Sequence, residues 1–218
     1  LFEKGPQLTP KDGTVLRGKT NHAVYLVSGG FLQLFSGYTF AQHGASKNMQ
    51  IIEDSELESY PKKGFVAPLD GTIIKASNSQ AVYVADKGQK RPMSGEVFRS
   101  RGILPKHIAV LSSEEVDGIT LGSWATPKEQ SFYTVGNTGQ LWLFKDGSKH
   151  SISNFVKGQR KITPDFTFSQ DENDAWTVGP GITPRDNTLV KGDGNGAVYV
   201  VLKSQLRLLS AAAFKARK

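Results

Sequence analysis

Cysteine is absent from this 218-residue sequence, and its absence excludes three kinds of chemistry. The chain can form no disulfide, no cysteine-ligated zinc site and no thiol nucleophile. Long apolar runs are absent too, because the longest candidate is interrupted at Ser28-Gly29-Gly30 and at Gln33. A membrane-spanning helix needs roughly 20 apolar residues, so the sequence predicts no membrane insertion.

The sequence also lacks an initiator methionine and a basic-then-apolar leader. It opens Leu1-Phe2-Glu3-Lys4-Gly5, as a processed or excised segment would. The 27 Lys and Arg outnumber the 20 Asp and Glu, which gives a net charge of +7, and 38% of residues are hydrophobic. This balance is typical of a soluble globular protein and fits either one large domain or two small ones.

The basic excess is scattered along the chain. It serves solubility, or it attracts a polyanion such as an acidic polysaccharide, a wall polymer or a nucleic acid. Nucleic-acid binding is disfavoured, since no basic cluster with interleaved aromatic residues supports it.

A repeat organises the chain, and two independent sets of residues reveal it. The prolines Pro10, Pro68, Pro127 and Pro184 are 58, 59 and 57 residues apart, and the aromatic residues Tyr25, Tyr83, Trp142 and Tyr199 have the same spacings. We therefore number repeat 1 as residues 10–67, repeat 2 as 68–126, repeat 3 as 127–183 and repeat 4 as 184–218, completed by 1–9.

Each repeat begins with short β-branched or aromatic runs bounded by Gly, Asp, Asn or Ser, which predicts three strands joined by tight turns. A serine follows the third strand in every repeat and predicts the N-cap of a short helix. These serines are Ser36, Ser94, Ser153 and Ser210. A further apolar stretch predicts a fourth strand, and repeat 3 departs from the others by opening with Glu129-Gln130-Ser131.

Four such repeats predict a mainly β fold, a four-bladed β-propeller with short helices on the rim that fills residues 1–218 as a single domain. Residues 5–10, Gly-Pro-Gln-Leu-Thr-Pro, align with residues 179–184, Gly-Pro-Gly-Ile-Thr-Pro. The alignment predicts that the N-terminus completes the last repeat and so joins the first and last blades. A stretch excised from a longer array is the alternative, and the count of four disfavours a β-trefoil.

Part of the repeat sequence resembles a known repeat. Residues 70–75, Asp-Gly-Thr-Ile-Ile-Lys, then 81–84, Ala-Val-Tyr-Val, then 88–92, Gly-Gln-Lys-Arg-Pro, resemble a repeat of secreted and surface-attached bacterial proteins. In its length and strand count the repeat is similar to hemopexin-like four-bladed propellers. The resemblance implies a secreted or cell-surface, non-catalytic module and transfers no catalytic residue.

Catalytic and metal-binding patterns are missing. The histidines His22, His43, His107 and His150 each stand alone, with no second ligand at metal-binding spacing. No serine-nucleophile elbow, phosphate-binding glycine loop or His-Glu-x-x-His motif occurs. The sequence therefore predicts no enzyme, no cofactor and no metal.

The candidate binding residues come from the third strand and from the ends of the repeats. One third-strand position is polar in every repeat, and it holds Gln33, Arg91, His150 and Arg207. We call these four residues the polar column. Such side chains contact loop backbone or solvent, or they form a ring of donors for an anionic or hydroxyl-rich ligand. Lys90 adjoins the column, while Trp124 and Trp176 near the repeat ends offer flat faces for a sugar ring or pack between blades.

These observations predict a lectin-like module that recognises a glycan or an anionic surface polymer through repeated weak sites. A protein-interaction or assembly propeller is the alternative, and a glycan hydrolase or lyase on the same fold is the third interpretation. An exposed apolar patch would favour protein partners, whereas clefts lined by Lys90, Arg91, Arg207 and a tryptophan would favour glycans.

Overall fold

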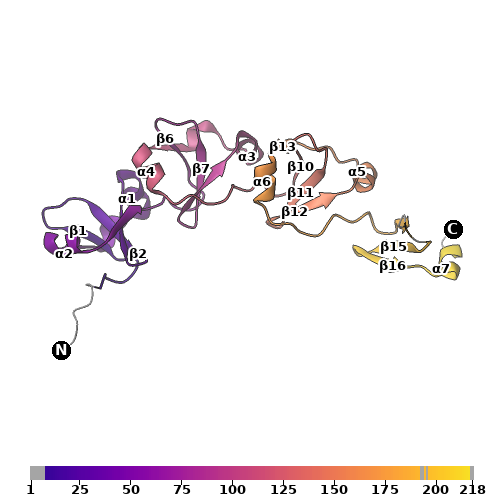
Figure 1. Cartoon of the computed structure of the whole chain (residues 1–218), viewed down its shortest axis with the longest axis horizontal. Coiled ribbons are helices and arrows are strands. Elements are labelled where there is room, and N and C mark those ends of the chain that lie inside the picture. Colours follow the sequence, from indigo (N-terminus) through magenta and orange to yellow (C-terminus); the bar gives the residue numbers. More distant parts are fainter. Residues whose placement is uncertain (1–7, 192–193, 195, 217–218) are drawn as a thin grey trace, which may run out of the picture. The chain divides into compact units, whose positions relative to one another are not determined.

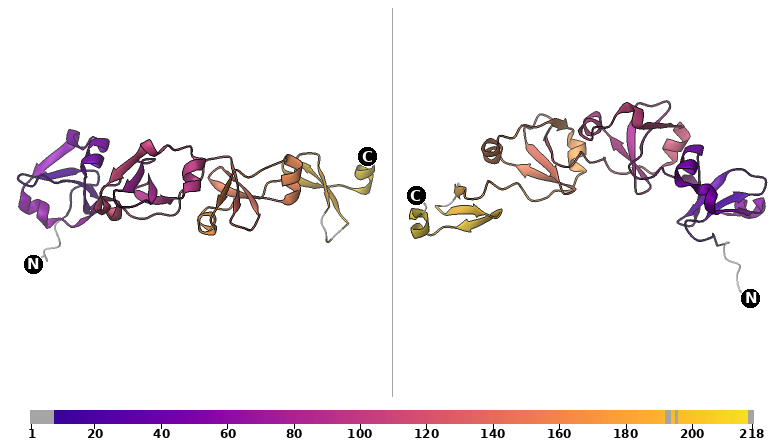
Figure 2. Two further views of the ribbon diagram at one scale, coloured as in Figure 1. Left: turned by 90° about the horizontal axis from the view of Figure 1, so that it is seen from above. Right: turned by 180° about the vertical axis from the view of Figure 1, so that it is seen from behind.

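The computed structural model describes residues 8–191, 194 and 196–216, and within them the strands form four separate sheets (Figure 1). The sheets hold three to five strands each, and none closes or curls upon itself in any view (Figure 2). The prediction of a closed four-bladed propeller is therefore wrong. The chain divides into two compact units: one has the described residues up to Ser94 together with Ile103–Ala125, and the other has Gly95–Gly102 together with the described residues from Thr126 onward.

Repeat 1 contains the largest sheet, in the order β4-β1-β2-β3-β5. Its elements are β1 (Val15–Gly18), β2 (Val24–Ser28), β3 (Phe31–Leu34), α1 (Gly37–His43), a 3-10 helix (Ala45–Asn48), β4 (Met49–Ile52), α2 (Asp54–Ser59) and β5 (Lys62–Phe65). The first three strands are antiparallel neighbours, as the tight turns predict. The two later strands are parallel to them, β4 beside β1 and β5 beside β3.

Repeats 2 and 3 have the same strand order in four-stranded form. Repeat 2 contains β6 (Ile73–Ala76), β7 (Val82–Asp86), β8 (Gln89–Met93), α3 (Gly95–Ser100), a 3-10 helix (Pro105–His107), β9 (Ile108–Leu111) and α4 (Ser113–Gly118). Repeat 3 contains β10 (Ser131–Val135), β11 (Leu141–Lys145), β12 (Ser148–Ile152), α5 (Asn154–Arg160), β13 (Phe166–Phe168) and α6 (Gln170–Asp174). Single parallel bridges, Lys90 to Leu121 and Lys149 to Val178, replace the fifth strand.

Repeat 4 is shorter. Its sheet has the order β14-β15-β16, made of β14 (Leu189–Lys191), β15 (Val198–Leu202) and β16 (Gln205–Leu208), followed by α7 (Ala211–Lys215). Within the described residues no strand pairs with the outer edge of β14 or of β16.

The sheet of repeat 1 buries both of its faces within its own repeat, so it does not need the radial packing of a propeller. In repeat 1 one face of the sheet packs on a cluster that includes Leu57 and Tyr60 from and just after α2. The other face packs on a cluster that includes Phe35 and Ala45, with Phe40 of α1 against it. Helices of the same repeat therefore cover both faces, and the hydrophobic effect is satisfied without a neighbouring blade.

The predicted helix caps are confirmed in three repeats. The hydroxyl oxygens of Ser36, Ser153 and Ser210 accept hydrogen bonds from the backbone three residues later, at 3.2, 3.2 and 3.1 Å. The second short helix of each of the first three repeats was not predicted. Its signal is present in repeats 2 and 3 as capping boxes, Ser112 with Glu115 and Ser169 with Glu172.

The Asp-Gly-Thr signature forms a recurrent turn that anchors the hairpin between the second and third strands. A carboxylate accepts from backbone N–H groups of the hairpin turn, as Asp70 does from Lys87 at 2.7 Å. The acids are Asp12, Asp70, Glu129 and Asp186. The residue directly after each of these acids has a positive φ, which explains why glycine occurs at that position. In repeat 3 the residue there is Gln130, and its φ is 65°. Repeat 3 therefore preserves the turn despite its different sequence.

Candidate functional site

The residues of the polar column lie at equivalent places in β3, β8, β12 and β16. Along the third strand of repeats 1 to 3 runs the segment that ends the repeat, and we call it the closing segment. The closing segments are residues 61–67, 120–126 and 177–183. Backbone hydrogen bonds join each one to its strand, for example from Lys149 N to Thr177 O and from Ile182 N to Ser151 O, both at 2.8 Å.

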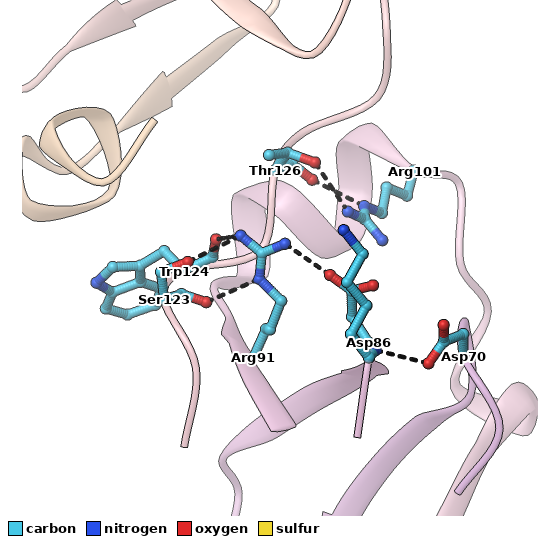
Figure 3. Close-up of polar contacts among 8 residues, drawn as sticks. Asp70, Asp86, Arg91, Arg101, Ser123, Trp124 and Thr126 are labelled. Carbon is cyan, nitrogen blue, oxygen red and sulfur yellow. Dashed lines mark hydrogen bonds and ion pairs between the residues drawn. The ribbon is translucent and has the colours of Figure 1, made fainter. Parts of the chain in front are cut away.

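Arg91 is held entirely by its own repeat (Figure 3). Its guanidinium donates to Asp86 Oδ2 at 2.8 Å and, through Nε and Nη2, to Ser123 O at 3.0 Å, Ser123 Oγ at 2.9 Å and Trp124 O at 2.9 Å. The planar fork of arginine suits such convergent acceptors. The N–H groups of Arg91 that would bind an anionic ligand therefore bind the closing segment and the Asp86 carboxylate.

His150 has the same role in repeat 3. Its Nδ1 lies 2.7 Å from Pro180 O, and its Nε2 lies 3.0 Å from Lys145 O. Pro180 and Ser123 occupy equivalent places, four residues before Pro184 and Pro127. Two repeats with different side chains thus hold the same carbonyl of the closing segment.

Lys90 is buried, at 7% exposure. Its ammonium donates to Val116 O at the end of α4, lies 5.3 Å from the centre of the Tyr83 ring, and is 3.8 Å from an Asp117 carboxylate oxygen. A cation near a helix C-terminus and over an aromatic face is favourable on both counts.

Lys149 is the equivalent residue of repeat 3, and the sequence analysis did not identify it. Its ammonium donates to Asn173 O of α6 and lies 5.3 Å from the centre of the Trp142 ring. Burial lowers the pKa of Lys149, and the nearby Asp174 carboxylate opposes that shift. The recurring Lys at one position of two third strands is the signal that could have identified this contact.

Trp176 and Trp124 differ in burial. Trp176 is 3% exposed and packs edge-on against Tyr133, Phe144 and Phe168, with ring centres 5.2 to 5.7 Å away. Burial also raises the pKa of Tyr133. Trp124 is half-buried in the closing segment that Arg91 holds.

Gln33 and His150 line two equivalent grooves where a closing segment meets the next repeat. The first, of about 650 Å³, is also lined by His43, Ala67, Asp70 and Lys87, and the second, of about 580 Å³, by Arg160, Thr183 and Ser204. In both grooves a basic residue at the end of a helix forms a hydrogen bond with the carbonyl oxygen of the residue before the repeat proline. The two pairs are His43 Nε2 with Ala67 O and Arg160 Nη2 with Thr183 O, each at 3.0 Å. Neither groove is lined by Lys90, Arg91, Arg207 or a tryptophan. Of the predicted binding residues the structure brings Arg91 and Trp124 together, through the Trp124 carbonyl, and places Gln33 and His150 in separate grooves.

Arg207 is the exception in the polar column. It lies exposed on β16, and its guanidinium donates to Gln205 Oε1 at 3.0 Å on its own strand. The described residues contain no closing segment beside it. Ligand binding by the seven predicted residues stays a prediction. Within the described residues, Arg207 is the member of the polar column that has no closing segment beside it.

Replacing Arg91 with alanine should destabilise repeat 2 by about 2 kcal/mol, because four donated hydrogen bonds disappear and Asp86 loses its cation. The matched variant Arg207→Ala should change stability by less than about 0.5 kcal/mol, as exposed surface substitutions do. Urea unfolding, with hydrogen exchange of the β8 amides, measures both effects. Equal effects of the two substitutions would contradict the assignment of Arg91 to the closing segment.

Metal and membrane features are absent from the described part of the chain. No group of three or more His, Cys, Asp or Glu residues there could hold a metal ion. No helix among those residues has the length and apolar character needed to cross a membrane.

Comparisons with known proteins give weak neighbours only. No protein-family model matches the chain, and no curated protein does. Among solved structures, the periplasmic assembly from the ESX-5 inner membrane complex matches with 11% identity and a TM-score of 0.24 over 91% of this chain and 71% of that one. An intact ESX-5 inner membrane complex matches with 10% identity and a TM-score of 0.23, and the EccB3 dimer from the ESX-3 core complex with the same values. The chain spans 64% and 63% of the length of these last two.

Proposed function

We propose that this chain is a non-catalytic, extracytoplasmic module that binds proteins by strand pairing at the sheet of repeat 4. A single observation carries the proposal. The sheets of repeats 1 to 3 have a parallel neighbour on both sides of their three-stranded meander, whereas the β14-β15-β16 sheet has none in the described residues. An unpaired sheet edge presents N–H and C=O groups that an extended segment can complete.

The exposed side chains of β16 support the same interpretation. Leu206 and Leu208 are 58% and 66% exposed, while the equivalent residues of repeat 3, Lys149 and Ser151, pair with the closing segment through their backbone groups. Apolar side chains beside open hydrogen-bonding groups favour a protein partner over a polysaccharide. The extracytoplasmic location rests on the resemblance of the repeat to those of secreted proteins, and no argument rests on the weak structural neighbours.

A photo-cross-linking residue placed at Leu208 of the full chain tests the proposal, with the same residue at Phe155, which is 56% exposed in repeat 3, as the matched control. We expect protein cross-links from position 208 and none of comparable yield from position 155. Leu206→Pro should abolish them, because it removes the N–H that the equivalent Lys149 donates to Thr177 O.

A glycan array with the unmodified protein and with Gln33→Ala provides the opposing measurement. Glycan binding that survives physiological salt and is lost in Gln33→Ala, together with no cross-link at 208, would overturn the proposal in favour of a lectin-like module. Cross-links at 208 that Leu206→Pro removes, with no such glycan binding, would support it.

A further inference from the structure

A pocket of about 380 Å³ lies within repeat 1, on the face of the sheet against which α1 packs. Its apolar lining comes from Val24 of β2, Phe35 directly after β3, Phe40 of α1 and Met49 of β4. Ligand pockets have volumes of about 300 to 1,000 Å³, so this one suits a small molecule. Every residue that lines it belongs to repeat 1 and to the described part of the chain.

Arg17 supplies positive charge to this pocket. It is half-buried on β1, between Val24 of β2 and Ile51 of β4. Its Nε is buried and has no hydrogen-bond partner in the part of the chain that the structure describes. None of the ion pairs between described residues includes Arg17. A buried donor without an acceptor is costly, so a ligand that supplies the acceptor gains affinity at this place.

The other polar groups of the pocket restrict what it can bind. Besides Arg17, the polar side chains of its described lining are those of His22 and Ser36, and none is acidic. The Ser36 hydroxyl oxygen already accepts the N–H of Thr39 as the cap of α1. The planar fork of arginine suits the two oxygens of a carboxylate. The pocket therefore matches one carboxylate joined to an apolar body, and it offers little to the further amide groups of a peptide.

We propose that the pocket of repeat 1 binds a small monocarboxylic acid with an apolar body. The Arg17 guanidinium holds the carboxylate, and the body packs against Phe35, Phe40 and Met49, where its removal from water contributes to the affinity. The site shares no residue with the β14-β15-β16 sheet. It is therefore a second binding activity, and it goes beyond the function proposed above.

Repeat 2 provides a matched control inside the same chain. At the repeat spacing of 58 residues, Arg17 corresponds to Lys75 and Phe35 to Met93. Lys75 has the same place in the register, since it lies opposite Val82 of β7 as Arg17 lies opposite Val24 of β2. A lysine cannot form the two-point contact of an arginine, so we expect the acid to select repeat 1.

Methyl NMR of the full chain locates the ligand, because the sequence has only two methionines, Met49 and Met93. Met49 lines the pocket, and Met93 lies on β8 of repeat 2. Octanoate should shift the Met49 methyl signal in a saturable way and leave that of Met93 unchanged. Acetate lacks the body and 1-octanol lacks the charge, so each should bind at least about tenfold more weakly. A Met49 signal that octanoate does not move, or an octanol affinity equal to that of octanoate, would overturn the proposal.

Arg17→Leu tests the role of the guanidinium, with Lys75→Leu as its control. Arg17→Leu should weaken octanoate binding at least about tenfold, whereas Lys75→Leu should leave it unchanged. Arg17→Lys should weaken binding less than Arg17→Leu does, because it keeps the charge. Without octanoate, Arg17→Leu should unfold at the same or a higher urea concentration, since it removes a buried donor that lacks an acceptor. An unchanged octanoate affinity in Arg17→Leu would refute the site.

The C-terminus of a peptide is the competing ligand. Acetyl-Ala-Ala-Leu with a free carboxylate presents the same charge beside an apolar side chain. We expect it to bind more weakly than octanoate, because its amide groups lose water without gaining partners. Tighter binding of the peptide would overturn the free acid as the ligand, and weaker binding would support it.

Discussion

Trp176→Ala is expected to lower the unfolding free energy of repeat 3 by about 3 to 5 kcal/mol, the range for truncating a large buried aromatic side chain. The indole is 3% exposed and contacts three aromatic rings from β10, β11 and β13, so its removal leaves a cavity that those rings cannot fill. Urea unfolding and near-ultraviolet circular dichroism of the full chain measure the loss.

Trp124→Ala is the matched control. Trp124 is half-buried, and the contact it makes with Arg91 uses its backbone carbonyl, which alanine keeps. We expect a smaller destabilisation and an unchanged core of repeat 3. If Trp176→Ala left the stability intact, the ring would be available for a ligand and the packing role would be refuted.

The parts of the fold that depend on neighbours in the sequence were predictable. Three strands per repeat follow from short β-branched runs and tight turns, and the caps follow from Ser36, Ser153 and Ser210. Both signals act within a few residues, so one repeat suffices to recognise them.

The architecture was not predictable in the same way, because it depends on parallel pairing across long intervals. β4 pairs with β1, and the closing segments pair with the third strands, about 30 residues away in sequence. A short apolar run does not specify its partner strand. The sequence did not predict the helices α2, α4 and α6, which lie in repeats 1 to 3. Without them, one face of each sheet needed a neighbouring blade to cover it, and this led to the prediction of a propeller.

The polar column illustrates the same limit at the site. Its four polar residues were identified from the sequence, but the closing-segment acceptors of Arg91 lie 32 and 33 residues downstream, and the closing-segment carbonyl beside His150 lies 30 residues downstream. A row of donors on a strand does not reveal whether its acceptors belong to a ligand or to the chain. The glycines at equivalent places, Gly122 and Gly179, were the available signal, because a recurrent glycine marks a close approach to another group.

Gly179→Ala is the substitution that tests this relation between glycine and polar column. Alone it should destabilise the closing segment of repeat 3 by about 1 to 3 kcal/mol, because the new methyl group overlaps the His150 ring, whose two nitrogens lie within 3.0 Å of carbonyl oxygens. His150→Ala alone should cost about 1 kcal/mol through the loss of the hydrogen bond that the ring donates. Hydrogen exchange at Gly179 and Ile182, whose N–H groups bind β12, measures the local effect.

The double variant decides between a steric conflict and a general loss of stability. With the ring removed, the methyl group added at position 179 has room, so Gly179→Ala with His150→Ala should be more stable than the sum of the two single effects by about 1 kcal/mol or more. Strictly additive effects would show that the glycine serves some other purpose. The non-additive result would mean that position 179 requires glycine because the His150 ring fills the space beside it.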